Sequence, residues 1–252
     1  MQRGIADWGG NIAAFVVTIL FNGLANGLPL NGQTTGEISD KYPSLFTPAG
    51  FTFGIWGLIY LGLIVFVIWQ ALPAQRKNQK VAAVSMLFKV NCLANALWIV
   101  VWHYDLLGVS LAVMLVILFT LVQIYRRLIA DIDFAPFGEH LVLYLPFSVY
   151  TAWITVATIA NASVLQIGNG WDDIAMSAVH WTLLKLAVAG AIGATMIVRF
   201  RDIPFALVIA WAAYGISVMQ SATPAVAGAA TTLSLLALLL VARDAALRLV
   251  GK

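Results

Sequence analysis

Eight runs of about 20 apolar residues divide this chain, and they constrain its fold more than any other feature. A helix needs roughly 20 apolar residues to cross the ~30 Å hydrocarbon core of a bilayer. The chain has 252 residues, of which 62% are hydrophobic and 10% are charged, whereas soluble domains average about 25% charged residues. We expect membrane spans at roughly 8–28, 50–72, 81–103, 106–126, 140–162, 175–198, 203–220 and 224–242.

Each run is expected to be a helix, because backbone N–H and C=O groups in lipid must be hydrogen-bonded inside the protein. The alternating pattern that a membrane β-strand of about ten residues would show does not appear. Pro204 and Pro224 stand at the starts of the last two runs, where proline is tolerated in a first helical turn. The sequence therefore predicts an all-α integral membrane protein of about eight transmembrane helices.

The Lys and Arg residues support this count of spans. Eight spans leave Lys41 on one side of the bilayer, together with Glu37, Asp40, Asp105, Asp172 and Asp173. Because cytoplasmic loops carry an excess of Lys and Arg, both termini are predicted to be cytoplasmic, and the membrane to be a bacterial inner membrane. The net charge of +3 then reflects topology and does not indicate nucleic-acid binding. The cations on the opposite side from Lys41 are Arg3, Arg76, Lys77, Lys80, Arg126, Arg127, Arg199, Arg201, Arg243, Arg248 and Lys252.

Polar and aromatic residues recur at steps of three and four in three of the runs, which places them on one face of each helix. Because an Asn side chain in hydrocarbon is unfavourable unless paired, these faces should point into the bundle. They either form interhelical hydrogen bonds that serve assembly alone, or line a small-molecule pocket of aromatic walls with a few polar groups. The residues are Asn11, Phe15, Thr18, Asn22 and Asn26, then Asn91, Asn95, Trp98 and Trp102, then Pro146, Tyr150, Trp153, Ala157 and Asn161.

Three sequence blocks carry a resemblance to a known family. They are residues 47–60 (TPAGFTFGIWGLIY), residues 95–98 (NALW), and residues 145–161, which include Pro146, Tyr150, Trp153 and Asn161. These blocks are similar to the motifs of the second, third and fifth helices of the TspO/MBR family of tryptophan-rich sensory proteins. Their order and spacing resemble the five-helix core of that family over about residues 8–165.

The resemblance implies a TspO-like five-helix core at residues 1–170 and an additional three-helix membrane segment at residues 171–252, packed on the core. It also implies a pocket that opens toward the outer face, is capped by the first loop and is lined by spans one, two, three and five. Ligands of the family are hydrophobic and often planar, so the implied ligand is a porphyrin-type or sterol-like molecule. Phe53, Trp56 and Tyr60 share one helical face and would stack on it, with ordinary packing as the alternative.

Lys185 is the most unusual single residue. It lies about ten residues inside the sixth run, roughly 15 Å from the outer end at 1.5 Å per residue. An ammonium group at that depth is unfavourable, and no Asp or Glu lies within a predicted span to pair with it. The residue is therefore neutral, solvated by Asn amides and water, or in contact with an anionic ligand.

The other titratable residues indicate no catalytic centre and no metal site, so we expect a protein that is not an enzyme. Cys92 is the only cysteine, which excludes an intrachain disulfide. His103, His140 and His180 lie near different span ends, where ordinary hydrogen-bonded or solvated histidines are expected. A single axial contact from His140 or His180 to a haem or chlorophyll is the remaining alternative.

Three functions fit these features. The first is binding, with transport or sensing, of a hydrophobic small molecule of the tetrapyrrole or sterol kind. The second is a non-catalytic subunit of a larger membrane complex, in which the last three spans contact a partner or a second copy of the chain. The third is a secondary transporter that uses Lys185, although no inverted repeat is visible in the sequence.

The predicted topology can be tested with single cysteines. We expect Gly36→Cys to be labelled by a membrane-impermeant thiol reagent from outside sealed cells, and Asn78→Cys to be labelled only from the cytoplasmic side. Equal labelling of both positions in sealed cells would contradict the topology with eight spans and two cytoplasmic termini.

Overall fold

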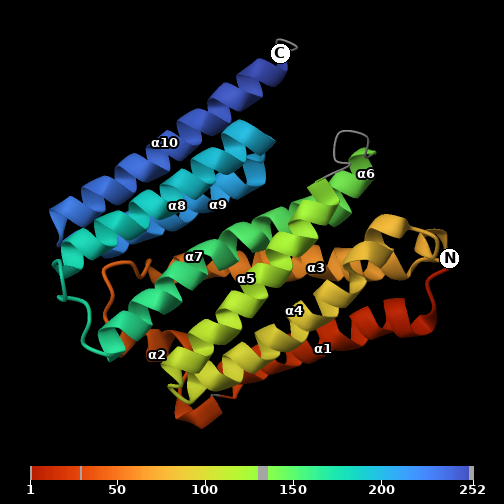
Figure 1. The fold of residues 1–252 in the computed structure, drawn as a ribbon, viewed down its shortest axis with the longest axis horizontal. Helices are drawn as coiled ribbons and strands as arrows, with labels where there is room; N and C mark the ends of the chain where they lie inside the picture. Colours follow the sequence, from red (N-terminus) through yellow and green to blue (C-terminus); the bar gives the residue numbers. More distant parts are fainter. Residues whose placement is uncertain (1, 29, 130–135, 250–252) are drawn as a thin grey trace. The chain divides into compact units, whose positions relative to one another are not determined.

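The computed structural model describes residues 2–28, 30–129 and 136–249, and every regular element in these ranges is a helix (Figure 1). The side chain of Asn26 lies outside the described part of the chain. The same holds for residues 130–135, which precede Phe137, and for Lys252, which is predicted to be cytoplasmic. The long helices are α1 (Ile5–Gly27), α3 (Ile55–Ala71), α4 (Gln79–His103), α5 (Leu107–Ile129), α7 (Leu145–Gly168), α8 (Ala178–Phe200), α9 (Ile203–Met219) and α10 (Pro224–Leu249). The short ones are η1 (Leu30–Gly32), α2 (Thr35–Asp40), η2 (Gly50–Gly54), η3 (Pro73–Gln75), α6 (Phe137–Glu139) and η5 (His140–Tyr144).

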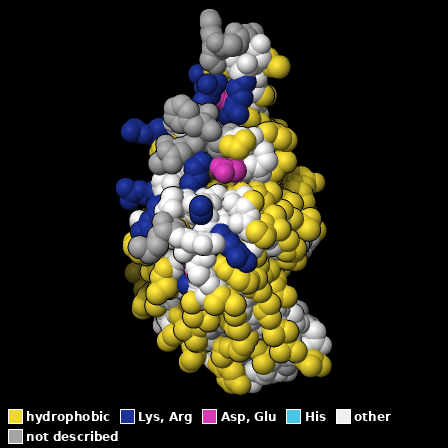
Figure 2. Space-filling view, turned by 90° about the vertical axis from the view of Figure 1, so that its right-hand side faces the viewer, with side chains coloured by type: hydrophobic (Ala, Val, Ile, Leu, Met, Phe, Trp, Pro, Cys, Tyr) yellow, Lys and Arg dark blue, Asp and Glu magenta, His cyan; other side chains and the backbone are white. Residues whose placement is uncertain are grey.

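Within the described ranges, seven helical segments are long and apolar enough to cross a membrane, which confirms the all-α membrane fold. The predicted span at 203–220 corresponds to α9, a shorter apolar helix whose 17 residues lie at the lower limit of the ~17–25 that a span needs. Figure 2 shows hydrophobic side chains over much of one face and Lys and Arg side chains gathered on another part of it. The side of the membrane on which the termini lie stays a prediction.

Side-chain caps explain where three of the helices begin. The Asn78 side chain accepts hydrogen bonds from the first N–H groups of α4, and Ser177 and Asp202 do the same for α8 and α9. Such caps satisfy N–H groups that have no partner within the helix. Helix α8 ends at Arg201, which adopts the left-handed conformation with φ of 54° and allows α9 to start two residues later.

The chain forms two compact units. Unit 1 comprises residues Met1–Ile38 and Trp56–Thr151, and unit 2 comprises Ser39–Ile55 and Ala152–Lys252. Helix α7 begins in unit 1 and ends in unit 2. The division of the chain at residue 170 stays a prediction, since these units follow from contacts and not from likeness to a family.

In unit 1, α4 packs against both α1 and α5 (Figure 1). Its core is a cluster of phenylalanines in which Phe66 contacts Phe88 and Phe147 edge to face, at ring-centroid distances of 5.1 and 5.0 Å. All three rings are at most 1% exposed. Gly62 of α3 allows close packing here, because a Cβ at that position would lie 3.1 Å from the Pro146 ring. The cluster ties α3 to α4 and to the first turn of α7.

A polar network closes one end of unit 1. Arg3, which is 5% exposed, donates hydrogen bonds to the Gln70 carbonyl and to the carboxylate of Asp7, both at 2.9 Å. The buried Asn11 amide donates to the Gln70 side chain at 3.3 Å, and the Ser85 hydroxyl donates to Asn11 at 3.0 Å. The network links α1 to the last turn of α3 and to α4, and the described ion pair of Arg3 with Asp7 is part of it.

In unit 2, α8, α9 and α10 pack against one another, and Figure 1 shows them as neighbouring cyan and blue helices. Gly193 of α8 lies against Ile209 of α9, and Gly190 lies against Leu233 of α10. At one end Asp244 forms ion pairs with Arg201 and Arg248, at 2.9 and 2.7 Å. Small residues at the contacts and a charged cluster at the end hold these three helices together.

The segment that precedes α3 is bound to α9 in unit 2. The Ala49 N–H donates to the Gly215 carbonyl at 3.0 Å, and the Trp211 indole donates to the Thr52 carbonyl at 3.0 Å. The Gln220 amide donates to the Thr47 carbonyl at 3.2 Å. These three bonds fix the backbone of the loop before α3, which the family resemblance describes as a cap, to one of the last three helices.

Gly215 allows this contact, because a Cβ at that position would overlap the Thr52 side chain. We expect Gly215→Ala to lower stability by about 1–3 kcal/mol through overpacking. The matched control is Gly228→Ala in α10, where an added Cβ meets nothing within 4 Å and should leave stability unchanged or raise it by up to ~1 kcal/mol. Thermal unfolding in one detergent measures both, and an equally stable Gly215→Ala variant would show that the contact relaxes freely.

Candidate functional site

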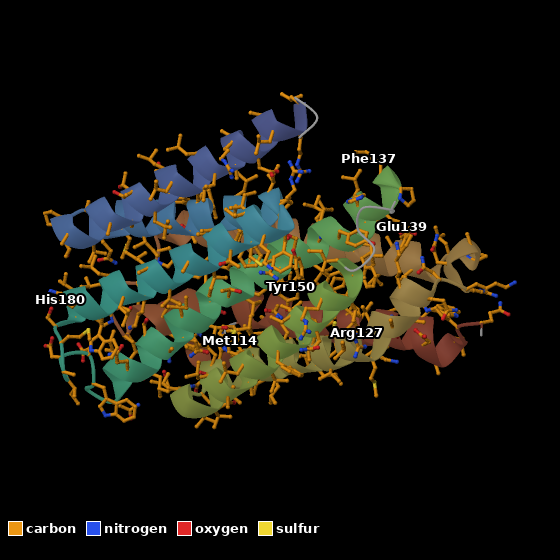
Figure 3. The ribbon with its side chains drawn as sticks, turned by 45° about the horizontal axis from the view of Figure 1, so that its top comes forward. Met114, Arg127, Phe137, Glu139, Tyr150 and His180 are labelled. Atoms are coloured by element: carbon orange, nitrogen blue, oxygen red, sulfur yellow. The ribbon has the colours of Figure 1, made fainter. Side chains whose placement is uncertain are left out.

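The first group of predicted site residues is an aromatic cluster in unit 1. Trp56 and Tyr60 lie one helical turn apart on α3, and their rings stack with a centroid distance of 5.4 Å and an interplanar angle of 23°. Tyr150 of α7, labelled in Figure 3, meets Trp56 edge to face at 6.0 Å. Trp56 and Tyr60 are partly exposed, whereas Tyr150 is 2% exposed. Part of the stacked pair is therefore accessible, and the buried Tyr150 ring packs against Trp56.

Amide groups of two helices reach the same cluster. The Asn95 side chain in α4 donates to the Tyr150 hydroxyl at 2.9 Å and accepts from the Asn22 amide of α1 at 2.7 Å. Asn95 is 1% exposed, so these bonds are made away from water. Side-chain networks in a low-dielectric interior fix the orientation of each member. The network joins α1, α4 and α7 and holds the Tyr150 ring against Trp56.

Asn91 and Trp98 also lie on α4 but contact other residues. The Asn91 amide donates to the Thr120 hydroxyl at 2.9 Å and to the Ile117 carbonyl at 3.1 Å, both on α5. Trp98 stacks on Trp102 with a centroid distance of 5.4 Å. Asn91 thus joins α4 to α5, the assembly role that we considered as the alternative, while the partly exposed Trp98 extends the aromatic surface of α4.

Pro146 lies in the first turn of α7, directly after the π-helical segment η5. The helical segment runs without a break from Phe137 to Gly168, so the missing N–H of Pro146 interrupts its hydrogen-bond ladder directly after the π-helical turn. The Pro146 ring packs against α3 at Gly62. The structure therefore places Pro146 at a helix–helix contact in unit 1.

The remaining predicted site residues belong to unit 2. Phe53 and Trp153 meet edge to face at a centroid distance of 5.9 Å and an interplanar angle of 88°. Phe53 is 38% exposed, whereas Trp153 and Asn161 are 2% and 3% exposed. The exposed Phe53 ring is therefore supported by a buried tryptophan, which repeats the arrangement of Trp56 on Tyr150 in the other unit.

Lys185 lies seven residues after the start of α8, and its ammonium group donates to the Gln166 side chain at 2.6 Å. Gln166 stands two residues before the end of α7. The lysine stem thus reaches toward a helix end, as long basic side chains commonly do, and its observed partner is a neutral amide. Lys185 lies closer to the start of α8 than predicted, because the helix begins at Ala178 and not at residue 175.

The three histidines occupy separate places. His103 is fully buried, with Nδ1 2.6 Å from the Ile99 carbonyl, and the His140 ring contacts Tyr144. His180 lies at the start of α8 beside the Ser177 hydroxyl, at 2.8 Å (Figure 3). Over residues 2–28, 30–129 and 136–249, no three His, Cys, Asp or Glu residues come together as a metal site would require.

Sequence reasoning did not identify the partners of these residues. Gln166 was not singled out, although its spacing of 19 residues from Lys185 across a loop is compatible with a contact between successive helices. Trp211 and Gln220, which bind the loop before α3, were also missed. The sequence signal available for them was a Trp, a Gly and a Gln placed along one apolar helix at residues 211, 215 and 220.

The amide network gives a stability prediction. Tyr150→Phe removes the hydroxyl that accepts from Asn95 and leaves a buried N–H without that partner, so we expect a loss of about 1–3 kcal/mol. Tyr214→Phe removes a hydroxyl from a side chain that is 51% exposed, and it should change stability by no more than ~0.5 kcal/mol. Thermal unfolding in detergent compares the two, and equal midpoints for both variants would rule out a stabilising role for the network.

Comparison with known proteins supports the family resemblance. A family model described as TSPO-like protein matches residues 7–243, which include α8, α9 and most of α10 as well as the three motif blocks. No curated protein and no solved structure matches the chain. The match extends over nearly the whole chain, and it confirms the resemblance that the motifs indicated. This chain therefore belongs to the family of TSPO-like proteins.

Proposed function

We propose that this protein binds a hydrophobic, planar small molecule of the tetrapyrrole or sterol kind within the membrane. Membership of the TSPO-like family indicates a membrane protein that binds or senses a ligand, of a kind that is generally not enzymatic. The ligand class is the further step. It rests on the stacked, partly exposed pair of Trp56 and Tyr60 in unit 1.

Two stacked rings side by side offer a flat, polarizable surface to a planar ligand. Aromatic side chains contribute large buried areas and prefer offset stacking or edge contacts, and such pairs add about 0.5–1.5 kcal/mol beyond their area. Trp56 is already held in position by Tyr60 and by Tyr150, whose hydroxyl is bound to Asn95. A surface that is fixed before binding loses little side-chain entropy when a ligand arrives.

The loop before α3, which belongs to unit 2, carries accessible aromatic rings of its own. Its backbone is bound to α9 through Ala49 and Thr52, and the exposed Phe53 ring follows directly. Phe51, which is 46% exposed, contacts the Trp211 ring at 5.3 Å. Phe51 and Phe53 thus form a second set of accessible aromatic rings. They lie on the loop that the family resemblance describes as a cap.

The proposal is tested by titrating the purified protein with a porphyrin and following the Soret band. Trp56→Ala should weaken binding by roughly 1–3 kcal/mol, or about 5- to 150-fold, because it removes a stacking surface. Trp98→Ala and Trp153→Ala are expected to weaken binding in the same direction. Trp153→Ala also removes a buried ring, so its unfolding midpoint is measured alongside.

The matched control is Trp171→Ala, which removes a tryptophan that is 52% exposed and lies between α7 and α8. Its affinity for the porphyrin should equal that of the unchanged protein. If Trp56→Ala, Trp98→Ala and Trp153→Ala all fold and bind as tightly as the control, the aromatic clusters serve packing alone. Purification with a stable partner protein and without any affinity for porphyrins or sterols would instead favour the role of a complex subunit.

A further inference from the structure

A basic hollow lies at one end of unit 1, away from the aromatic cluster. It has a volume of about 370 Å³, is open to the surface and is lined by Gln2, Arg3, Gly4, Ile5, Trp8 and Arg76. Small-molecule sites commonly measure ~300–1,000 Å³. The hollow joins the start of α1 to the connection that follows α3, and the Arg3 N–H donates to the Arg76 carbonyl at 2.7 Å.

The two arginines in this hollow differ in their bonding. Arg3 is almost completely buried, and its two terminal nitrogens are bound to Asp7 and Gln70. The Arg76 guanidinium lies over the Trp8 ring, 6.0 Å from the centroid. The Nε atoms of Arg76 and Arg3 are both buried, and no residue in the described part of the chain accepts a hydrogen bond from either. Arg76 thus keeps donor groups available for a ligand.

The charge balance around the hollow favours an anion. The carboxylate of Asp7 is bound by Arg3 and by the Ser85 hydroxyl, and Asp7 does not line the hollow. Gly4 and Ile5 at the start of α1 line the hollow, and Gly4 supplies no side-chain acceptor for the first N–H groups of this helix. Uncapped helix starts attract phosphate and other anions. Arginine is the side chain whose fork of donors matches phosphate oxygens best.

The position of the hollow indicates where the anion would come from. Arg3 and Arg76 stand just outside the apolar segments Ile5–Ala25 and Gly50–Ala71, at the level of lipid headgroups. Ile5 on the same rim is 72% exposed, so an apolar surface adjoins the charged one. Trp8 is an amphipathic ring of the kind that prefers the membrane interface. This end is the one predicted to be cytoplasmic, and basic pockets on that side bind anionic headgroups.

We propose that the hollow between Arg3, Trp8 and Arg76 binds a phosphate group, carried by an anionic membrane lipid. Arg76 donates to the phosphate oxygens, the start of α1 adds its N–H groups, and the acyl chains lie along the exposed side of Ile5. Arg3 is held by the polar network beneath and supplies charge to the site. The site is separate from the ligand cluster around Trp56 and does not depend on the proposed function.

The test uses the full chain in a neutral detergent, titrated with short-chain phosphatidylglycerol, phosphatidylcholine of the same chain length, or inorganic phosphate. Unfolding midpoints and native mass spectra report binding. We expect phosphatidylglycerol to bind and raise the midpoint, and Arg76→Gln to weaken its binding about tenfold or more, as the loss of a charge-assisted hydrogen bond implies. Phosphatidylcholine should have little effect.

Lys77→Gln is the matched control, because it removes the same charge from the neighbouring, exposed residue that does not line the hollow. It should leave phosphatidylglycerol binding within about twofold of the unchanged protein. A second variant, Ile5→Glu, places a carboxylate on the rim without disturbing a buried residue. It should also abolish binding, which keeps the test decisive if Arg76→Gln lowers stability on its own.

Inorganic phosphate that reproduces the shift with the same dependence on Arg76 would support the phosphate site and identify its ligand as free phosphate. Equal losses in Arg76→Gln and Lys77→Gln would overturn the proposal, since general surface charge would then explain binding. Equal binding of phosphatidylcholine and phosphatidylglycerol, or undiminished binding to Ile5→Glu, would overturn it as well.

Discussion

Polar groups in this protein must find their partners inside the protein, because hydrocarbon offers none. The backbone meets this condition by forming helices throughout the spans. The side chains meet it in a few networks, such as Asn22 with Asn95 and Tyr150, and Arg3 with Asp7 and Gln70. Apolar contacts distinguish weakly between one helix pairing and another, since lipid tails are as apolar as leucine. These polar contacts therefore select which helices of each unit lie together.

One of these networks, Asn22 with Asn95 and Tyr150, also reaches the proposed ligand site. The side-chain amide of Asn95 donates to the Tyr150 hydroxyl and accepts from the Asn22 amide. Its effect on a ligand is indirect, through the position of the Tyr150 ring against Trp56. Asn95 thus serves both roles considered for the polar and aromatic helix faces, because it joins helices and also positions a ring of the proposed ligand site. In Asn91, whose amide is bound to α5, assembly is the role that the contacts support.

The helices and their membrane character could be predicted from the sequence, because long apolar runs are local signals. The exact starts of α4 and α8 were not predicted, since the N-caps Asn78 and Ser177 were not recognised. Helical spacing predicted one shared face for Trp56 and Tyr60, and the structure shows that their rings stack on each other. Phe53, predicted on the same face, lies in η2 and meets Trp153. Contacts between distant segments could not be predicted in this way. Gln166 with Lys185, or Trp211 with the Thr52 carbonyl, requires knowing which helix faces lie together. A single sequence indicates which face of each helix is buried. It does not indicate which face of which other helix packs against it.

The loop before α3 has a consequence for how the protein is made. Its carbonyl at Thr52 is bound by Trp211, which lies 159 residues further along the chain. At a synthesis rate of ~5–20 residues per second, Trp211 emerges about 8 to 30 s after the loop. During that interval, α3, α4, α5, α7 and α8 leave the ribosome while the loop still lacks its anchor on α9. The aromatic rings of this loop therefore take up their final positions only once the C-terminal helices have entered the membrane.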